Sequence, residues 1–178
     1  MLVKITITIL FASLIFVSTF ACADAVRDAN RLLRVTNLGD RFESMALDQT
    51  RKIIRTYTSI VNMSASVALP QSLKNSIAEC YAQVYAWELF EPGIAEIFAQ
   101  NLSEKEIRLL IDFYSSRGLP PMEIETFKNT IAKAGQIERS SIEYIFNNSD
   151  SCVERDAELI NNFLASQNLD STEIIRIE

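Results

Sequence analysis

The chain has 178 residues, of which 48% are hydrophobic and 22% are charged, and its formal net charge is −6. This size allows one domain with a sizeable core, and the acidic balance argues against general binding to nucleic acid or anionic lipid. Histidine is absent, which removes the usual general base and metal ligand. With so few glycines and prolines, we expect an all-α, single-domain bundle of about five to seven helices.

Residues 1–23 predict a signal peptide. One positive charge precedes a long uncharged run, and Ala21-Cys22-Ala23 fits a small-x-small cleavage motif. Cleavage between Ala23 and Asp24 would leave a helical domain over residues 24–178 without an integral membrane span. Two alternatives stay open: Cys22 is a lipid-anchored N-terminus, or the uncharged run stays as a membrane anchor. All three place the folded part outside the cytoplasm, so we expect a periplasmic or secreted protein.

The remaining cysteines, Cys80 and Cys152, are an even pair in a chain that we expect in an oxidising compartment. We therefore predict a disulfide between them, and the alternative is two separately buried thiols. Closing so long a loop stabilises a fold by roughly 4 kcal/mol in the chain-entropy model. The absence of a C-x-x-C motif argues against a redox-active pair.

Hydrophobic spacing predicts three successive helices in the first half of the mature chain. The first runs from Asp24 to Leu38 and ends at a left-handed Gly39. The second runs from Asp40 to about Ala65. The third follows Pro70 and runs to about Phe90, where Glu91-Pro92-Gly93 breaks the chain and leads into a short apolar helix.

The stretch over residues 101–121 carries a complete set of helix signals. Ser103 and Glu106 have the spacing of a capping box, and Leu102 and Ile107 occupy the flanking hydrophobic positions. Gly118 ends this helix. Further helices are expected from Pro121 onward, with an interruption at Gly135, and over residues 150–166, where Asp150 or Ser151 is the cap.

Two segments of this stretch, Leu102–Ile107 and Phe113–Gly118, together resemble the hallmark of the domain of unknown function 2059 family, and Leu32–Leu38 resembles the family's opening helix. The resemblance covers roughly residues 29–145. It departs from the family where Ser116-Arg117-Gly118 replaces a serine-proline-x-glycine turn, and a later lysine-x-proline element is not clearly present. The resemblance implies a secreted or periplasmic all-helical domain of Gram-negative bacteria without an assigned activity.

Two groups of polar residues near this stretch are candidate sites. The first is an acidic neighbourhood that comprises Glu104, Glu106, Asp112, Glu123 and Glu125. We predict no metal there, because Glu104 and Glu106 point in different directions from one helix and no dense acidic loop occurs. The second is an interaction cluster formed by Tyr114, Ser115 and Arg117, for which the alternative is that these residues only end the helix and complement its dipole.

No catalytic residue and no cofactor are predicted, since a nucleophilic serine would lack a base and glycine-rich phosphate loops are absent. We expect a non-enzymatic module of the cell envelope that contacts another envelope protein or itself, and does not bind nucleic acid. The alternative is a carrier that holds an apolar small molecule or lipid inside the bundle, suggested by the aromatic excess over residues 81–98. An enzyme that uses carboxylates is a third hypothesis.

Overall fold

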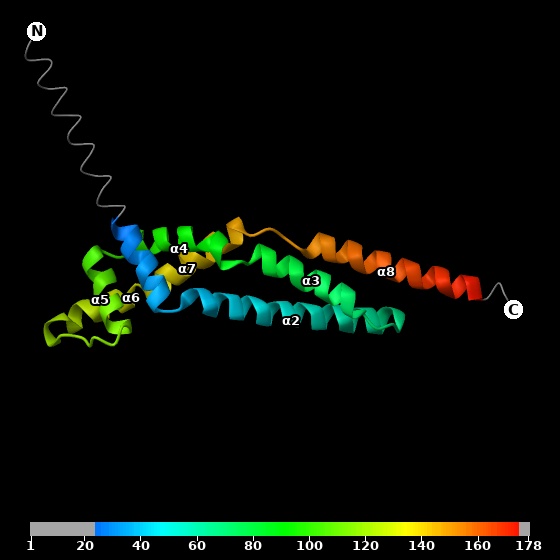
Figure 1. The fold of residues 1–178 in the computed structure, drawn as a ribbon, viewed down its shortest axis with the longest axis horizontal. Coiled ribbons are helices and arrows are strands. Elements are labelled where there is room, and N and C mark those ends of the chain that lie inside the picture. Colours follow the sequence, from blue (N-terminus) through cyan, green and yellow to red (C-terminus); the bar gives the residue numbers. More distant parts are fainter. Residues whose placement is uncertain (1–23, 175–178) are drawn as a thin grey trace, which may run out of the picture. The chain divides into compact units, whose positions relative to one another are not determined.

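The computed structural model describes residues 24–174, and the side chains of residues 24–167, so the predicted signal peptide with Cys22 and Ala23 lies outside the described residues. The described residues contain helices and no strand, which confirms the all-α prediction. The first helix covers residues 24–35. The others are α2 (Leu38–Ala65), α3 (Gln71–Val84), α4 (Trp87–Asn101), α5 (Glu104–Tyr114), the short 3-10 helix η1 (Pro121–Glu123), α6 (Ile124–Ala132), α7 (Ala134–Asn148) and α8 (Val153–Ile174) (Figure 1).

The described chain forms two compact units, and each is built from segments that are distant in sequence. Unit 1 holds residues up to Asp40 and residues 88–148, whereas unit 2 holds residues 41–87 and those from Ser149 onward. No helix among the described residues is long and apolar enough to cross a membrane.

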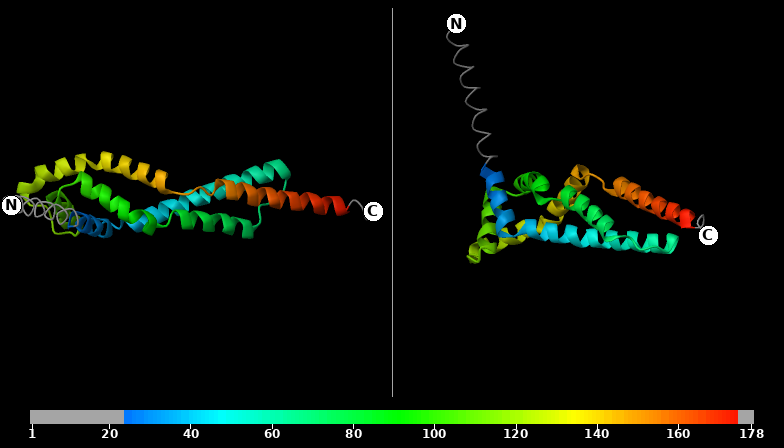
Figure 2. Two further views of the ribbon diagram at one scale, coloured as in Figure 1. Left: turned by 90° about the horizontal axis from the view of Figure 1, so that it is seen from above. Right: turned by 45° about the vertical axis from the view of Figure 1, so that its right-hand side comes forward.

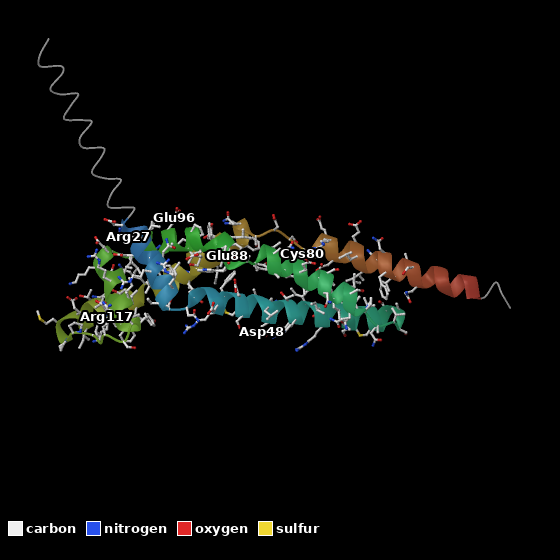
Figure 3. All side chains as sticks on the ribbon, viewed as in Figure 1. Arg27, Asp48, Cys80, Glu88, Glu96 and Arg117 are labelled. Atoms are coloured by element: carbon white, nitrogen blue, oxygen red, sulfur yellow. A yellow bond between two sulfur atoms is a disulfide. The ribbon has the colours of Figure 1, made fainter. Side chains whose placement is uncertain are left out.

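Unit 2 consists of α2, α3 and α8. Figure 2 shows that α3 runs antiparallel to both α2 and α8. Its core is formed by buried side chains from α2, α3 and the adjoining loops: Val61, Leu69, Ile77, Cys80, Tyr81 and Cys152. The α8 helix packs partly buried side chains against this core: Ile160, Phe163 and Leu164. Cys80, labelled in Figure 3, is bonded to Cys152, and their Cα atoms are 6.1 Å apart. The predicted disulfide is therefore confirmed, and it joins the start of α8 to α3.

Unit 1 consists of the helix over residues 24–35 with α4, α5, α6 and α7. Apolar residues at helical spacing supply its core, and the most completely buried are Ala29, Phe90, Ala95 and Ile107, each 0% exposed. The ring of Phe90 meets that of Tyr144 edge-on, with centroids 6.5 Å apart, which joins α4 to α7. The α5 helix packs against α6, which in turn packs against α7.

Two predicted breaks in the first half were placed wrongly. The first helix ends at residue 35 and the turn uses Asn37 in the left-handed region (φ 54°), while Gly39 already lies inside α2. Asparagine is the residue that most often replaces glycine there, because its short polar side chain tolerates this conformation. The third helix ends at Val84, where no glycine or proline marks the sequence.

The segment Glu91-Pro92-Gly93 is not a break but lies within α4. Proline removes one donor from the helix, and the rest of the ladder continues around it. The glycine serves packing, because a β-carbon at position 93 would overlap with the ring of Tyr144. Gly93, a residue type that predicts a turn, therefore provides a contact surface for α7.

The later boundaries fall close to the expected ones. The interruption between α6 and α7 is at Lys133, two residues before Gly135. The terminal helix extends to Ile174, beyond the expected end at residue 166, and Ser151 supports its start by accepting a hydrogen bond from Val153 N–H at 3.3 Å.

Candidate functional site

The capping box at the start of α5 is present in full. Ser103 Oγ accepts a hydrogen bond from Glu106 N–H at 3.3 Å, and Glu106 Oε2 accepts one from Ser103 N–H at 2.7 Å. Leu102 and Ile107, on either side, are 4% and 0% exposed. These local contacts fix where α5 begins and hence which of its side chains face solvent.

The carboxylate of Glu106 also reaches a partner that is distant in sequence. Lys133, between α6 and α7, lies 2.7 Å from Oε1 and 2.8 Å from Oε2, and it also donates to the backbone oxygen of Asn101 at 3.3 Å. Burial by itself would raise the pKa of Glu106, but the bonds from Lys133 and Ser103 outweigh it and lower the pKa to about 2. Glu106 is thus a fixed anion that ties two helix junctions together.

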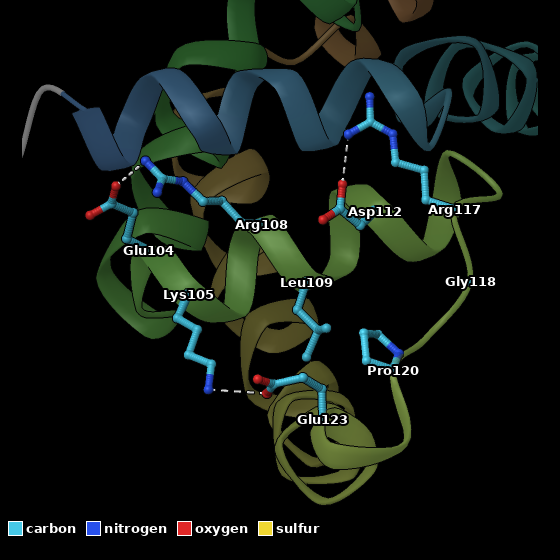
Figure 4. A pocket seen from close by; sticks show the side chains of 9 residues that line it. All are labelled: Glu104, Lys105, Arg108, Leu109, Asp112, Arg117, Gly118, Pro120 and Glu123. Carbon is cyan, nitrogen blue, oxygen red and sulfur yellow. Dashed lines mark hydrogen bonds and ion pairs between the residues drawn. The ribbon is translucent and has the colours of Figure 1, made fainter.

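A charged, open depression of about 450 Å³ lies beside α5 (Figure 4). It is lined by ionic side chains together with Leu109, Gly118 and Pro120. Each carboxylate of the acidic neighbourhood has a cationic partner: Glu104 with Arg108, Glu106 with Lys133, Asp112 with Arg117, Glu123 with Lys105 and Glu125 with Lys128. Arg108 also bonds Asp28 at 3.1 Å, which joins α5 to the first helix.

These ion pairs limit the chemistry that the depression can support. Oε2 of Glu123 is shielded from solvent and lies 3.0 Å from Lys105 Nζ, and this ammonium lowers the pKa of Glu123. Acid catalysis at neutral pH needs a carboxyl whose pKa is raised, and those of Glu106 and Glu123 are lowered. Among the described residues, no three acidic or cysteine side chains are grouped in a way that could hold a metal ion.

An apolar surface lies on the same two helices, and we call it the α5–α6 patch. It comprises Phe113, Tyr114, Ile124, Phe127 and Ile131. The α6 members recur at positions i, i+3 and i+7, so they share one face of that helix. The rings of Phe113 and Phe127 lie 4.7 Å apart, and Tyr114 meets Phe113 edge-on at 5.3 Å, which makes the patch continuous across both helices.

The three residues of the predicted interaction cluster have separate surroundings. Tyr114 belongs to the α5–α6 patch and is 49% exposed. Ser115 caps the C-terminus of α5 with its backbone N–H. Arg117 turns to Asp112, with Nη1 3.0 Å from Oδ1, and lines the depression in Figure 4. Among the described residues, no hydrogen bond, ion pair or ring contact joins these three side chains to one another.

A buried polar cluster in unit 2 was missed by sequence reasoning. Asp156 on α8 is 0% exposed, and neither of its carboxyl oxygens accepts a hydrogen bond from the described residues. The hydroxyls of Tyr57 on α2 and Tyr81 on α3 are close enough to act on it, and burial raises the pKa of both Asp156 and Tyr81. One signal was available: Asp156 is four residues after Cys152, so a disulfide at Cys152 places it on the inner face of the helix.

Comparison with known proteins adds nothing to this geometry, since no family model, curated protein or solved structure matches the chain. The likeness of residues 29–145 to the domain of unknown function 2059 family stays a prediction.

Proposed function

We propose that this protein is a non-enzymatic helical module of the cell envelope and that it works by protein contact through the α5–α6 patch. The observation that carries the proposal is the exposure of large apolar side chains on one continuous surface. Phe113, Tyr114, Ile124 and Ile131 are between 41% and 49% exposed. Single exposed apolar residues are normal on any protein, but an apolar surface with aromatic side chains at its centre is typical of interaction sites.

The geometry of the patch suits a helical partner. Residues at i, i+3 and i+7 of α6, together with an aromatic pair from α5, form the kind of ridge that packs into a hydrophobic groove. The ion pairs beside α5 supply a polar border. Such a border contributes little to affinity but helps to orient a partner.

A non-enzymatic role is supported by the chemistry of the charged depression. Each of its acids is engaged by a lysine or arginine, and the chain contains no histidine that could serve as a base. Lys105 lowers the pKa of Glu123, whereas a general acid at neutral pH needs a raised pKa.

The location outside the cytoplasm is supported by the disulfide, since such bonds persist in oxidising compartments. In this proposal residues 1–23 are removed as a signal peptide, with cleavage between Ala23 and Asp24, and the chain is a divergent member of the domain of unknown function 2059 family. Intact mass and N-terminal sequencing of the protein recovered from the producing cell test the cleavage. A chain beginning at Met1, or a lipid on Cys22, would contradict it.

The test of protein contact compares two variants. The doubly substituted Phe113→Ser, Ile124→Ser chain loses apolar area from the patch, whereas the control Met63→Ser changes a side chain on α2 that is 76% exposed. Light scattering after size exclusion measures self-association, and crosslinking in envelope extract followed by affinity capture measures hetero-association. We expect the double variant to lose its self-associated or captured partner and the control to keep it. A wild-type chain that is monomeric and captures nothing refutes the proposal.

The carrier alternative finds less support. Three depressions among the described residues open to solvent, and each has charged or hydroxyl-bearing side chains in its lining. The aromatic residues that suggested a ligand have other contacts: Phe90 packs on Tyr144, and Tyr81 stacks on Tyr85 with centroids 6.4 Å apart. Native mass spectrometry of the purified chain would reverse this preference if it showed a retained lipid or apolar molecule.

A further inference from the structure

Asp156 is an unusual residue for the interior of unit 2. Its side chain is 0% exposed, and both carboxyl oxygens lack a hydrogen bond from the described residues. Its backbone N–H donates a hydrogen bond to the backbone oxygen of Cys152 at 2.9 Å. An ionised carboxylate in such a place loses its hydration, and the nearby tyrosine hydroxyls compensate for that loss only in part.

Burial favours a neutral carboxyl at Asp156, and the neighbours on each packed helix oppose this effect only in part. Tyr57 comes from α2 and Tyr81 from α3, while on α8 itself the charged neighbour that acts on Asp156 is Arg155, which is solvent-exposed. A protonated carboxyl can donate to a tyrosine hydroxyl, and it needs no counter-ion. The burial of this site outweighs the effects of these side chains, so a protonated Asp156 is favoured over a charged one.

Asp156 lies at the point of α8 where the covalent anchor ends and non-covalent packing begins. It lies one turn after Cys152, whose partner Cys80 immediately precedes Tyr81. The disulfide holds the first residue before α8 against α3. Packing of the helix beyond that point depends on non-covalent contacts, including those of Ile160, Phe163 and Leu164 with the core of unit 2. The buried carboxyl stands between the covalent anchor and this apolar contact.

We propose that Asp156 is a proton-binding site that couples the packing of α8 onto α2 and α3 to pH. With the proton bound, the neutral side chain stays buried beside Tyr57 and Tyr81 and the helix is packed. When the proton leaves to solvent, the carboxylate gains hydration by exposure, so α8 opens while the disulfide keeps its start in place. This device does not depend on the protein contact proposed for the α5–α6 patch.

The direction of the pH effect follows from burial. Burial raises the pKa of Asp156 above its ordinary value of 3.8, against opposing effects of Tyr81, Arg155 and Tyr57. The packed state therefore binds more protons than the open state above pH 3.8, and stability must fall as pH rises until the packed state is also ionised. Linkage of one proton limits the rise in the opening constant to tenfold per pH unit.

The test is hydrogen exchange of the full, oxidised chain, followed by mass spectrometry over residues 156–167 between pH 4 and pH 8 and divided by the intrinsic exchange rate. We expect the corrected exchange of wild type to rise with pH. In Asp156→Asn, which keeps the shape and cannot ionise, it should be independent of pH and slower than wild type at pH 8. The matched control is Glu158→Gln, an exposed acid on the same helix, which should keep the wild-type rise.

Three outcomes overturn the proposal. They are a wild-type exchange that does not depend on pH, an unchanged dependence in Asp156→Asn, and faster exchange in Asp156→Asn than in wild type at neutral pH. Because the variant could fold poorly, the carboxyl carbon of Asp156 is also titrated by NMR in the wild-type chain. A midpoint above that of an ordinary aspartate supports proton binding by the folded state, and a midpoint at or below it refutes the proposal.

Discussion

The ring of Tyr144 on α7 lies against the backbone of Gly93 in α4, so closely that a β-carbon at position 93 would overlap with Cζ, Oη and Cε1 of the ring. We expect Gly93→Ala to destabilise the fold by about 1–3 kcal/mol, the usual cost of overpacking, although alanine is the better helix former. Urea unfolding measures this change as a lower midpoint with an unchanged slope.

The control for this substitution is a second helical glycine with open surroundings. A β-carbon on Gly135 would meet only the Arg139 guanidinium, at an ordinary contact distance of 3.7 Å. Gly135→Ala should therefore be neutral or stabilise by up to about 1 kcal/mol. If both alanine variants behave alike, the contact between Tyr144 and Gly93 does not constrain the fold. Tyr144→Leu combined with Gly93→Ala should recover part of the loss, because the two sites are coupled.

Helix boundaries could be predicted from the sequence where residues close together in the chain fix them. The start of α5 depends on two side chains three residues apart, Ser103 and Glu106, and was predicted to the residue. The break after Val84 has no such signal, and Gly93 carried a misleading one, because its purpose is a contact with a residue 51 positions later in the chain. Sequence spacing reports what a residue does to its own helix, not what another helix requires of it.

The same distinction holds for the candidate sites. The acidic residues around α5 were visible as a group, but their pairing with lysines and arginines is a tertiary property, as in Glu106 with Lys133. Ile124 and Ile131 have the spacing of a buried helix face, but the structure leaves them 43% and 44% exposed. Asp156 was missed because a carboxylate is expected at the surface, and only the disulfide turns that helix face inward.

The ion pair between Glu106 and Lys133 should contribute to stability only above acidic pH. Because the pKa of Glu106 falls to about 2 on folding from an ordinary value of 4.5, its contribution is fully present above pH 4.5 and is lost as pH falls towards 2. We expect Lys133→Met to lower the free energy of unfolding by about 1–2 kcal/mol at pH 7 and to flatten the acid limb of a stability profile.

Its control is Lys128→Met, which breaks an exposed pair with Glu125 at 3.7 Å. Such a pair is worth less than about 0.5 kcal/mol, so the control should unfold like wild type at every pH. Equal losses of unfolding free energy in both lysine variants at pH 7, or an unchanged acid limb in Lys133→Met, would contradict this prediction. Either result would show that the half-buried pair stabilises the fold no more than the exposed pair does.

The capping box gives a prediction about a single hydroxyl. Ser103→Ala removes the acceptor of Glu106 N–H and one donor to the Glu106 carboxylate, and we expect a loss of about 1 kcal/mol. The matched control is Ser59→Ala, an exposed serine within α2, where alanine should be neutral or slightly stabilising. Thermal unfolding by circular dichroism distinguishes them, and a Ser103→Ala midpoint equal to that of Ser59→Ala would argue against the cap.

The disulfide should stabilise unit 2 without being accessible to mild reductant. Cys80 and Cys152 are 8% and 1% exposed, so a reductant reaches the bond only when α8 or the whole unit opens. We expect the bond to resist millimolar reductant in buffer and to be reduced quickly in urea.

The double variant Cys80→Ala, Cys152→Ala should lose up to roughly 4 kcal/mol of stability, because the loop of about 73 residues is no longer closed in the unfolded chain. Thiol labelling with and without urea, combined with unfolding curves of both chains, measures the two effects. Rapid reduction under native conditions would contradict the burial of the bond, and equal stability of the two chains would contradict its role as the anchor of α8.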